Sequence, residues 1–349
     1  MTLEETLEKI HPADKTAMEA ALAHWNNIAM PLHSLGRLQD TVVRIAGMTG
    51  NARVDLKKKA LVVMCADNGV VEEGVTQSGQ EVTKIVAENF LKEKATASIL
   101  CKKAGADIFP VDIGIATDST ILQHKVMYGT KNMAKEPAMT REQAVQALEV
   151  GIHMVEELKE KGYGIVATGE MGIGNTTTSS AVAAALLSCD PKEITGKGAG
   201  LSDTALLRKI AVVEEGIQMH ELYQADAFDV LCAVGGLDIA GLSGVFIGGA
   251  LAHVPVVVDG VISAVAALAA ERMIPGVRDY VIPSHKSREP AAERILEELG
   301  IRPVLDAGLA LGEGTGAVMM CGLLDIARTI YGERTTFADI DVAPYHRFG

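Results

Sequence analysis

Short apolar runs that end in Asp, Gly or Ser recur along this chain, and most are followed by a stretch with helical periodicity. We predict strands at residues 60–70, 107–114, 163–169, 228–236, 254–260, 279–285 and 302–306. We predict intervening helices at residues 81–105, 140–162, 209–223, 243–253, 263–274 and 289–300. Such alternation is typical of a mostly parallel sheet covered on both faces, so the sequence predicts a three-layer α/β/α fold.

The two ends of the chain lack this alternation. Residues 1–47 have the composition of helices, interrupted near Pro31 and Gly36, and no strand is predicted before residue 60 or after residue 306. With 349 residues the chain is long enough for more than one unit. We therefore expect residues 1–50 and 307–349 to form a small helical domain beside an α/β domain of residues 51–306.

Composition excludes several classes of partner. The net charge of −13 and an aromatic content of 4% argue against a nucleic-acid partner. The N-terminus is unlike a signal peptide, and the apolar stretches are broken by Gly, Asp or His, so no membrane span is expected. The five cysteines are far apart and the histidines are scattered, which predicts free thiols in the cytoplasm, no metal site and no bound cofactor.

The stretch GEMGIGNTTT, residues 169–178, follows one predicted strand and precedes an alanine-rich helix. Backbone N–H groups between Gly172 and Thr176, with the threonine hydroxyls, could cradle a phosphate at the helix N-terminus. The alternative is a tight turn in which Asn175 or a threonine caps the helix. In either case Glu170 stands at the carboxyl edge of the sheet, where open parallel sheets bind ligands.

A second glycine-dense stretch, LGEGTGA at residues 311–317, places Glu313 between two glycines. A carboxylate in such an apolar loop is poorly solvated, so its pKa rises and it becomes suited to general-base catalysis near neutral pH. The alternative is an acid that caps the helix predicted over residues 315–328.

Other polar residues follow predicted strands. The loop at residues 66–83 carries Asp67, Asn68, Ser78, Gln80 and Glu81, which serve either as substrate contacts or as turn and cap residues. Ser284, His285 and Arg288 follow another strand. We expect His285 to be a helix cap or a surface residue, and a lone helical lysine such as Lys209 is ordinarily solvated.

The chain resembles the nicotinate-nucleotide:dimethylbenzimidazole phosphoribosyltransferases of cobamide assembly. The resemblance covers residues 31 to about 328 and is carried, in order, by PLHSLGRLQD, ADNGVVEEGV with QEVT, TGEMGIGNTTTSSA, VGGLDIAGLSG, PVVVDG, SHKSREP and LDAGLALGEGTGA. It implies a Rossmann-like large domain, a small helical domain built from both termini, and a homodimer.

The resemblance also implies a reaction, in which nicotinate mononucleotide gives its ribose 5-phosphate to an aromatic base and releases nicotinate. The product is an α-ribotide, and Glu313 is the implied general base. The donor's phosphate and ribose are implied to contact Glu170, Gly172, Gly174, Asn175, Thr176, Lys209, Asp259, Gly260, Ser284 and Gly312.

The acceptor half departs from the family pattern. Relatives usually have histidine where this chain has Asn68, and an aromatic residue and a proline where it has Ser78 and Gly79. We expect Ser78, Gln80 and Lys84 to contact the acceptor, which is 5,6-dimethylbenzimidazole or a similar base. The alternatives are a phenol or p-cresol acceptor, with a paralogous subunit in a heterodimer, and a non-catalytic nucleotide-binding paralogue.

Overall fold

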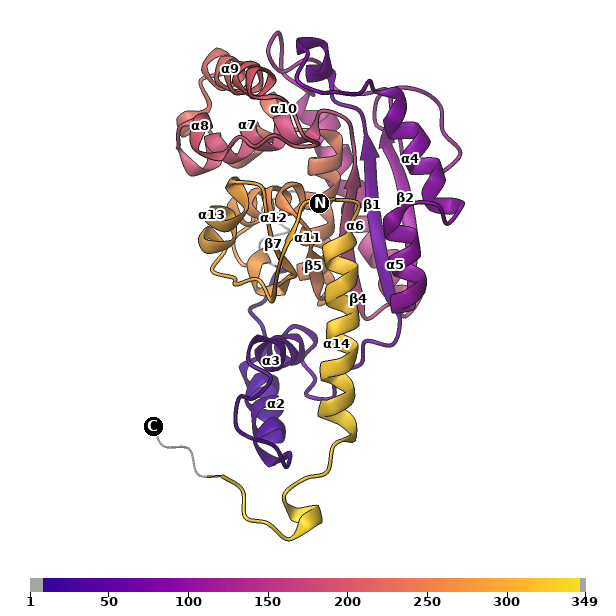
Figure 1. The fold of residues 1–349 in the computed structure, drawn as a ribbon, viewed down its shortest axis with the longest axis vertical. Coiled ribbons are helices and arrows are strands. Elements are labelled where there is room, and N and C mark those ends of the chain that lie inside the picture. Colours follow the sequence, from indigo (N-terminus) through magenta and orange to yellow (C-terminus); the bar gives the residue numbers. More distant parts are fainter. Residues whose placement is uncertain (1–8, 346–349) are drawn as a thin grey trace.

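A six-stranded parallel sheet forms the centre of the computed structural model, which describes residues 9–345 (Figure 1). Its strands are β1 (Lys59–Ala66), β2 (Ala106–Gly114), β3 (Leu122–Gln123), β4 (Ile165–Met171), β5 (Val256–Val258) and β6 (Val281–Pro283). They lie in the order β3-β2-β1-β4-β5-β6, and every neighbouring pair is parallel. Strand β1 is buried along its whole length, which explains why it reads as an unbroken apolar run.

Helices cover both faces of the sheet, as predicted. Helices α4 (Glu81–Leu91), α5 (Thr96–Ala104) and the first part of α14 (Thr315–Glu333) pack on one face. Helices α6 (Arg141–Glu160), α11 (Leu237–Ala252) and α12 (Val261–Met273) form the layer on the other face. The α/β class and the three layers are therefore confirmed.

The strand order reverses between β1 and β4, since the chain runs outward from β1 to β3 and then returns to β4. Open parallel sheets have a crevice at the carboxyl ends of the strands beside such a reversal. Here β1 is followed by Asp67, β4 contains Glu170 near its end, and β5 is followed by Asp259. This topology places the polar strand ends around one crevice.

Beyond the amino ends of the strands, helices α2 (Lys15–Asn27) and α3 (Arg37–Thr49) pack beside the second part of α14 (Figure 1). The rings of Trp25 and Tyr331 lie 4.9 Å apart, and Ile28 forms an antiparallel bridge with Thr336. Helix α14 is continuous from the sheet to this contact. The division into two domains stays a prediction, and the parts of it that concern residues 1–8 and 346–349 lie outside the described residues.

The remaining helices and strands surround the carboxyl edge or connect the larger elements. They are α7 (Asn175–Leu187), α8 (Pro191–Ile194), α9 (Asp203–Met219), α10 (Ala227–Val234), α13 (Ala291–Glu298), the parallel pair β7 (His285–Ser287) and β8 (Leu305–Leu309), and the short 3₁₀ helices η1 (Gly69–Glu73), η2 (Leu222–Gln224), η3 (Val277–Tyr280) and η4 (Ala338–Ile340). Strand β8 crosses the expected domain boundary at residue 306.

Two predicted elements were wrong. Residues 228–236 form helix α10 and its end instead of a strand, because a short apolar run fits a buried helix equally well. Asp226, whose side chain accepts from the backbone N–H of Asp229 at 2.8 Å, is the N-cap that signals this helix. The helix predicted over residues 81–105 is two helices, separated where Glu93 has a φ of 54°. Strands β3 and β7 were not predicted.

All five cysteines are buried and free, as predicted. Within residues 9–345, no helix combines the length and the apolar character needed to cross a membrane.

Candidate active site

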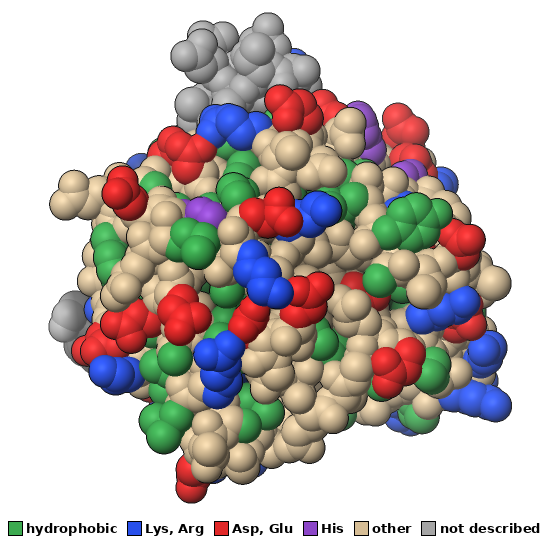
Figure 2. Space-filling model, turned by 90° about the horizontal axis from the view of Figure 1, so that it is seen from above, with side chains coloured by type: hydrophobic (Ala, Val, Ile, Leu, Met, Phe, Trp, Pro, Cys, Tyr) green, Lys and Arg blue, Asp and Glu red, His purple; other side chains and the backbone are tan. Residues whose placement is uncertain are grey.

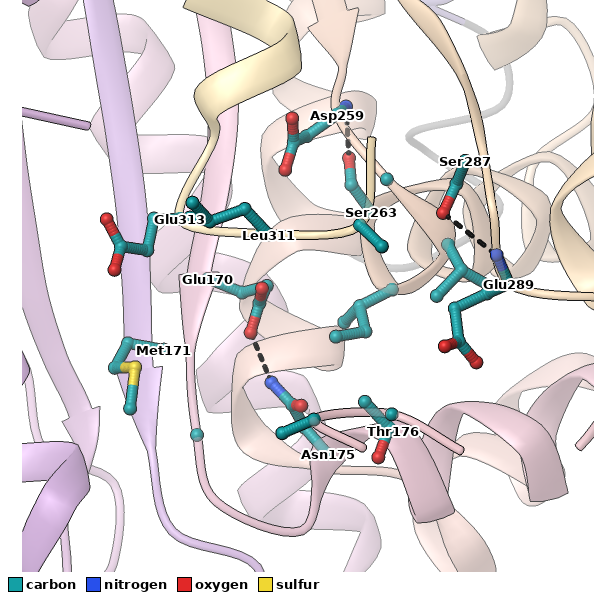
Figure 3. A pocket seen from close by; sticks show the side chains of 18 of the residues that line it. Glu170, Met171, Asn175, Thr176, Asp259, Ser263, Ser287, Glu289, Leu311 and Glu313 are labelled. Atoms are coloured by element: carbon teal, nitrogen blue, oxygen red, sulfur yellow. Dashed lines mark hydrogen bonds between the residues drawn. The ribbon is translucent and has the colours of Figure 1, made fainter. Parts of the chain in front are cut away.

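A cavity of about 270 Å³ lies at the carboxyl edge of the sheet, beside β4 and β5. Figure 3 shows Glu313 and Met171 at one end, Thr176 and Glu289 at the other, and Glu170 and Asn175 between them. The β4–α7 turn, the start of α12, strand β7 and the turn before α14 supply the lining.

Most of the site residues named from the sequence meet at this cavity. Its lining includes Glu170, Gly172, Asn175, Thr176, Asp259, Gly260, Gly312 and Glu313. A smaller adjoining cavity of about 100 Å³ shares the β4–α7 turn and is lined by Gly174 and Ser78. Neither lining includes Lys209, Ser284, Gln80 or Lys84.

Gly169, at the end of GIVATG, lies where the turn before α14 packs closely against β4. A Cβ atom added to Gly169 would lie 2.7 Å from the carbonyl oxygen of Glu313. The absence of a side chain at Gly169 thus brings the turn before α14 against β4. This contact brings Glu170 and Glu313, which are far apart in sequence, to the same cavity.

Glu170 is joined to a second buried carboxyl group through one amide. Asn175 Nδ2 donates hydrogen bonds to Glu170 Oε2 and, at 2.9 Å, to Asp238 Oδ2. Burial raises the pKa of Glu170, and it raises the pKa of Asp238 to about 7, in both cases against the opposing effect of the amide. Asp238 lies in the first turn of α11 and was not named from the sequence; its only signal was its place in VGGLDIAGLSG.

Helix α7 begins at Asn175 with Gly174 as its N-cap, and no side chain caps it. The sequence alternative in which Asn175 or a threonine caps this helix was therefore wrong. An N-terminus without a side-chain cap retains backbone donors and a partial positive charge for an anion.

Lys209 adds a cation behind this N-terminus. Its Nζ donates hydrogen bonds to Thr176 Oγ1 at 2.9 Å and to the carbonyl oxygen of Gly196 at 3.0 Å. The expectation of a solvated lysine was wrong, since Lys209 is 0% exposed. Burial lowers its pKa to about 8, while Glu289 acts in the opposite direction.

Asp259, which lines the cavity, holds the start of α14. Its carboxylate accepts from the backbone N–H groups of Gly314 at 3.1 Å, Gly316 at 2.8 Å and Ala317 at 3.1 Å. Burial raises its pKa to about 7, and these three donors oppose the rise. Asp259 therefore fixes the turn that carries Glu313.

Glu313 occupies a turn in which three successive residues have positive φ, namely Gly312 at 85°, Glu313 at 61° and Gly314 at 87°. Left-handed backbone costs a residue other than glycine about 1–2 kcal/mol. The carboxylate does not cap α14; its Oε2 accepts from the backbone N–H of Ala97, at the start of α5, at 3.1 Å. Burial nevertheless raises the pKa of Glu313, in the direction expected of a general base.

His285 lines the cavity and is buried, so the expectation of a helix cap or a surface residue was wrong. Its Nδ1 lies 3.1 Å from Ser284 Oγ, which donates to the carbonyl oxygen of Asp259 at 3.2 Å. Burial lowers the pKa of His285, which favours a neutral imidazole. Ser284 thus lies behind the cavity wall, between His285 and Asp259.

The residues assigned to the acceptor are not brought together. Gln80 Nε2 donates to the carbonyl oxygen of Asn68 at 3.2 Å, and the side chain of Asn68 is fully buried and lines neither cavity. Of the three named residues, only Ser78 lines either of these two cavities, namely the smaller one. Apolar side chains that the sequence analysis did not name line the larger cavity: Val86, Met171, Ile173, Val261, Ile262 and Leu311.

Figure 2 shows the molecule from above, with acidic and basic side chains interspersed over this face. There is no broad basic surface in this view. Together with the net charge of −13, this distribution suits a small ligand better than a polyanionic polymer.

Comparisons with known proteins agree over almost the whole chain. A family model described as phosphoribosyltransferase matches residues 10–342. A nicotinate-nucleotide–dimethylbenzimidazole phosphoribosyltransferase of Acetivibrio thermocellus is 46% identical, covering 98% of this chain and 98% of that protein. One of Clostridium tetani is 44% identical, covering 97% and 95%. The crystal structure of CobT from Thermus thermophilus matches with a TM-score of 0.89 and 36% identity, covering 94% and 99%.

Proposed function

The chain belongs to the nicotinate-nucleotide–dimethylbenzimidazole phosphoribosyltransferase family, and we propose that it carries out the reaction named by its relatives. The protein transfers ribose 5-phosphate from nicotinate mononucleotide to 5,6-dimethylbenzimidazole and releases nicotinate. The observation that most directly supports this proposal is that Glu313 and the N-terminus of α7, which no side chain caps, lie at the same cavity. The names of the relatives contain dimethylbenzimidazole and no phenol, which supports dimethylbenzimidazole as the acceptor.

The phosphate of the donor binds at the end of the cavity formed by Thr176. The N-terminus of α7, which no side chain caps, lies at this end, and the ammonium group of Lys209 lies 2.9 Å from Thr176 Oγ1. A helix N-terminus and a cation attract a phosphate together, although the protein as a whole is acidic. Gly198, which also lines the cavity, contributes wall without a side chain.

Glu313 acts at the other end as the general base. The nicotinate of the donor is a pyridinium, so it departs without a proton and needs no acid. The azole acceptor must lose its N–H proton as its nitrogen bonds to C1′ of the ribose, and a carboxylate with a raised pKa accepts that proton. Attack on the face opposite to nicotinate inverts the β donor to an α product.

Glu170 lies between the two ends of the cavity (Figure 3), and the ribose of the donor binds beside it in this proposal. Positive charge develops on C1′ as nicotinate leaves, and a carboxylate in a buried site stabilises it more effectively than one in water. The aromatic acceptor packs on Met171 and Leu311, which lie beside Glu313 (Figure 3), and on Val86, which also lines the cavity. This wall replaces Gln80 and Lys84 as the proposed acceptor surface.

An acceptor screen tests this function. Purified protein and nicotinate mononucleotide are incubated with 5,6-dimethylbenzimidazole, benzimidazole, adenine, phenol or p-cresol, and nicotinate release and ribotide mass are measured. We expect α-ribotide from the benzimidazoles. Product from the phenols alone would overturn the proposed acceptor. The absence of nicotinate release with every acceptor would overturn the proposed function. The Glu313→Gln variant serves as the control for contaminating activity.

We further propose that the protein works as a homodimer. Large apolar side chains are exposed on the helices of one layer, with Ile85 of α4 at 55%, Ile99 of α5 at 59% and Ile326 of α14 at 59%. Exposed apolar surface of this kind is typical of subunit contacts. Light scattering on the purified chain should give twice the mass of one chain; a monomer would favour a heterodimer with a paralogue.

A further inference from the structure

Both N–H groups of the Asn175 side-chain amide donate hydrogen bonds. Nδ2 donates one hydrogen bond to Glu170 Oε2 and the other to Asp238 Oδ2. An amide group has two N–H donors on its nitrogen and acceptor sites only on its oxygen. Rotating the amide by 180° would turn its oxygen toward Glu170 Oε2 and Asp238 Oδ2, which repel it when the carboxyl groups are ionised, so the ionised carboxylates fix the orientation.

The fixed orientation leaves Asn175 Oδ1 on the side away from the two carboxyl groups. Figure 3 shows the amide nitrogen turned to Glu170 and the oxygen turned away from it. Asn175 lines both cavities, and among residues 9–345 none donates a hydrogen bond to Oδ1. The cavity thus receives an acceptor from Asn175, and no donor.

Asp238 is rigidly held. It lies in the first turn of α11, is 0% exposed, and accepts a hydrogen bond from the backbone N–H of Ile239 on Oδ1 at 3.0 Å. Its second oxygen is the one that contacts Asn175. Each oxygen of Asp238 therefore faces an N–H donor, and neither position tolerates an NH₂ group.

An acceptor in the middle of the cavity selects among the groups of the donor nucleotide. The phosphate oxygens are acceptors themselves and gain nothing from Oδ1, whereas the ribose hydroxyls are donors. We propose that Asp238 is a positioning residue, which holds the Asn175 amide so that Oδ1 accepts a hydrogen bond from a ribose hydroxyl of the donor. This inference rests on the proposed function and deepens it.

The Asp238→Asn variant tests the inference because it keeps the shape of the side chain. The NH₂ group of the new asparagine must face either the backbone N–H of Ile239 or Nδ2 of Asn175. In the second arrangement two donors repel each other, and a 180° rotation of the Asn175 amide removes that repulsion. Rates are measured with nicotinate mononucleotide and with its 2′-deoxy and 3′-deoxy analogues. The wild type should prefer the parent donor over one analogue by about tenfold or more, the effect of one lost hydrogen bond.

In Asp238→Asn we expect kcat/KM for the parent donor to fall about tenfold, mainly through KM, and the preference over that analogue to disappear. The KM for dimethylbenzimidazole should not change. If Asp238 had only a structural role, the variant would show an equally lowered kcat/KM with all three donors and would keep the preference for the parent donor. That result would overturn the inference. Asp40→Asn is the matched control, since Asp40 lies in the first turn of α3 but is exposed.

A second variant and a binding measurement keep the test decisive. If Asp238→Asn does not fold, Asn175→Ala must abolish the same preference, and an unchanged preference in it would overturn the inference. If the wild type releases no nicotinate with any acceptor, the proposed function fails, and calorimetry with the three donors replaces the rates. Equal binding of all three donors by the wild type would then overturn the ribose contact.

Discussion

The carboxylate of Glu313 accepts a hydrogen bond of 3.1 Å from the backbone N–H of Ala97 and so links the turn before α14 to the start of α5. The partial positive charge at the start of a helix favours the ionised carboxylate, whereas burial favours the protonated one. Burial is the stronger effect, since the pKa of Glu313 is raised. Ala97 therefore keeps the base in one orientation while the apolar surroundings keep its proton affinity high.

Replacing Glu313 by glutamine should remove the base and keep the shape of the site. We expect kcat to fall by about 10²–10⁴-fold, the usual contribution of a general base, with nearly unchanged binding of nicotinate mononucleotide. Steady-state rates and calorimetry measure the two quantities. Glu160→Gln, at an exposed position at the end of α6, is the matched control. Near wild-type turnover in Glu313→Gln would contradict the assignment.

The same residue should set the acid side of the pH profile. A general base works only when it is deprotonated, so activity falls as the pH falls through its pKa. Because burial raises that pKa, kcat/KM should decline with a midpoint above the ordinary glutamate value of 4.5. The residual activity of Glu313→Gln should lack this decline. If the decline persists in the variant with the same midpoint, a different carboxyl group is the base.

Lys209 should make the stability of the protein depend on alkaline pH. Its pKa is about 8 in the folded chain and ordinarily 10.5, so unfolding takes up a proton between these values. Lys209 should therefore contribute stability that rises by about 3 kcal/mol in total as the pH rises from 8 to 10.5. The buried thiols, whose pKa values are raised, act in the opposite direction in this window, so the contribution of Lys209 is measured as a difference between variants. Urea unfolding across this window should show that the stability of the wild type and of Lys57→Met, an exposed control, rises relative to that of Lys209→Met. Parallel curves for the wild type and Lys209→Met would contradict the prediction.

The fold was largely predictable because strands buried on both faces, such as β1, leave an apolar run that ends in a polar residue. Residues 228–236 leave a similar run although they form a helix, so the run alone does not separate the two. The N-cap at Asp226 is the sequence feature that distinguishes this helix from a strand.

The site was predictable only where one local motif carries several of its residues. Glu313, Asn175 and Thr176 stand in glycine-dense turns that the sequence displays. Asp238 lies 63 residues from Asn175, and the two meet only because β4 and α11 pack together. The burial of Lys209 likewise depends on what covers its helix face, which periodicity does not reveal. The roles of all these residues remain predictions that the variants test.

The lone tryptophan should report on the coupling of the helical region to the sheet. Trp25 packs on Tyr331 of α14, and the same continuous helix packs on β4. We therefore expect tryptophan fluorescence and far-ultraviolet circular dichroism to change together in urea, as in one cooperative transition. A fluorescence change at lower urea would instead show that the helical region unfolds separately, as an independent domain.

Gly312 should not tolerate a side chain. Its φ is 85°, and a Cβ atom would lie 2.5 Å from Glu170 Oε1, so Gly312→Ala both strains the backbone and displaces a cavity carboxyl group. We expect about 1–3 kcal/mol of lost stability and a larger loss of activity than the loss of stability explains.

Gly322→Ala is the matched control, because nothing lies within 4 Å of its added Cβ in the middle of α14. That variant should gain about 0.5–1 kcal/mol, since alanine favours helix, and urea unfolding with rate assays compares the two. Equal stability and activity in both variants would mean that the turn before α14 shifts freely, which the three hydrogen bonds to Asp259 oppose.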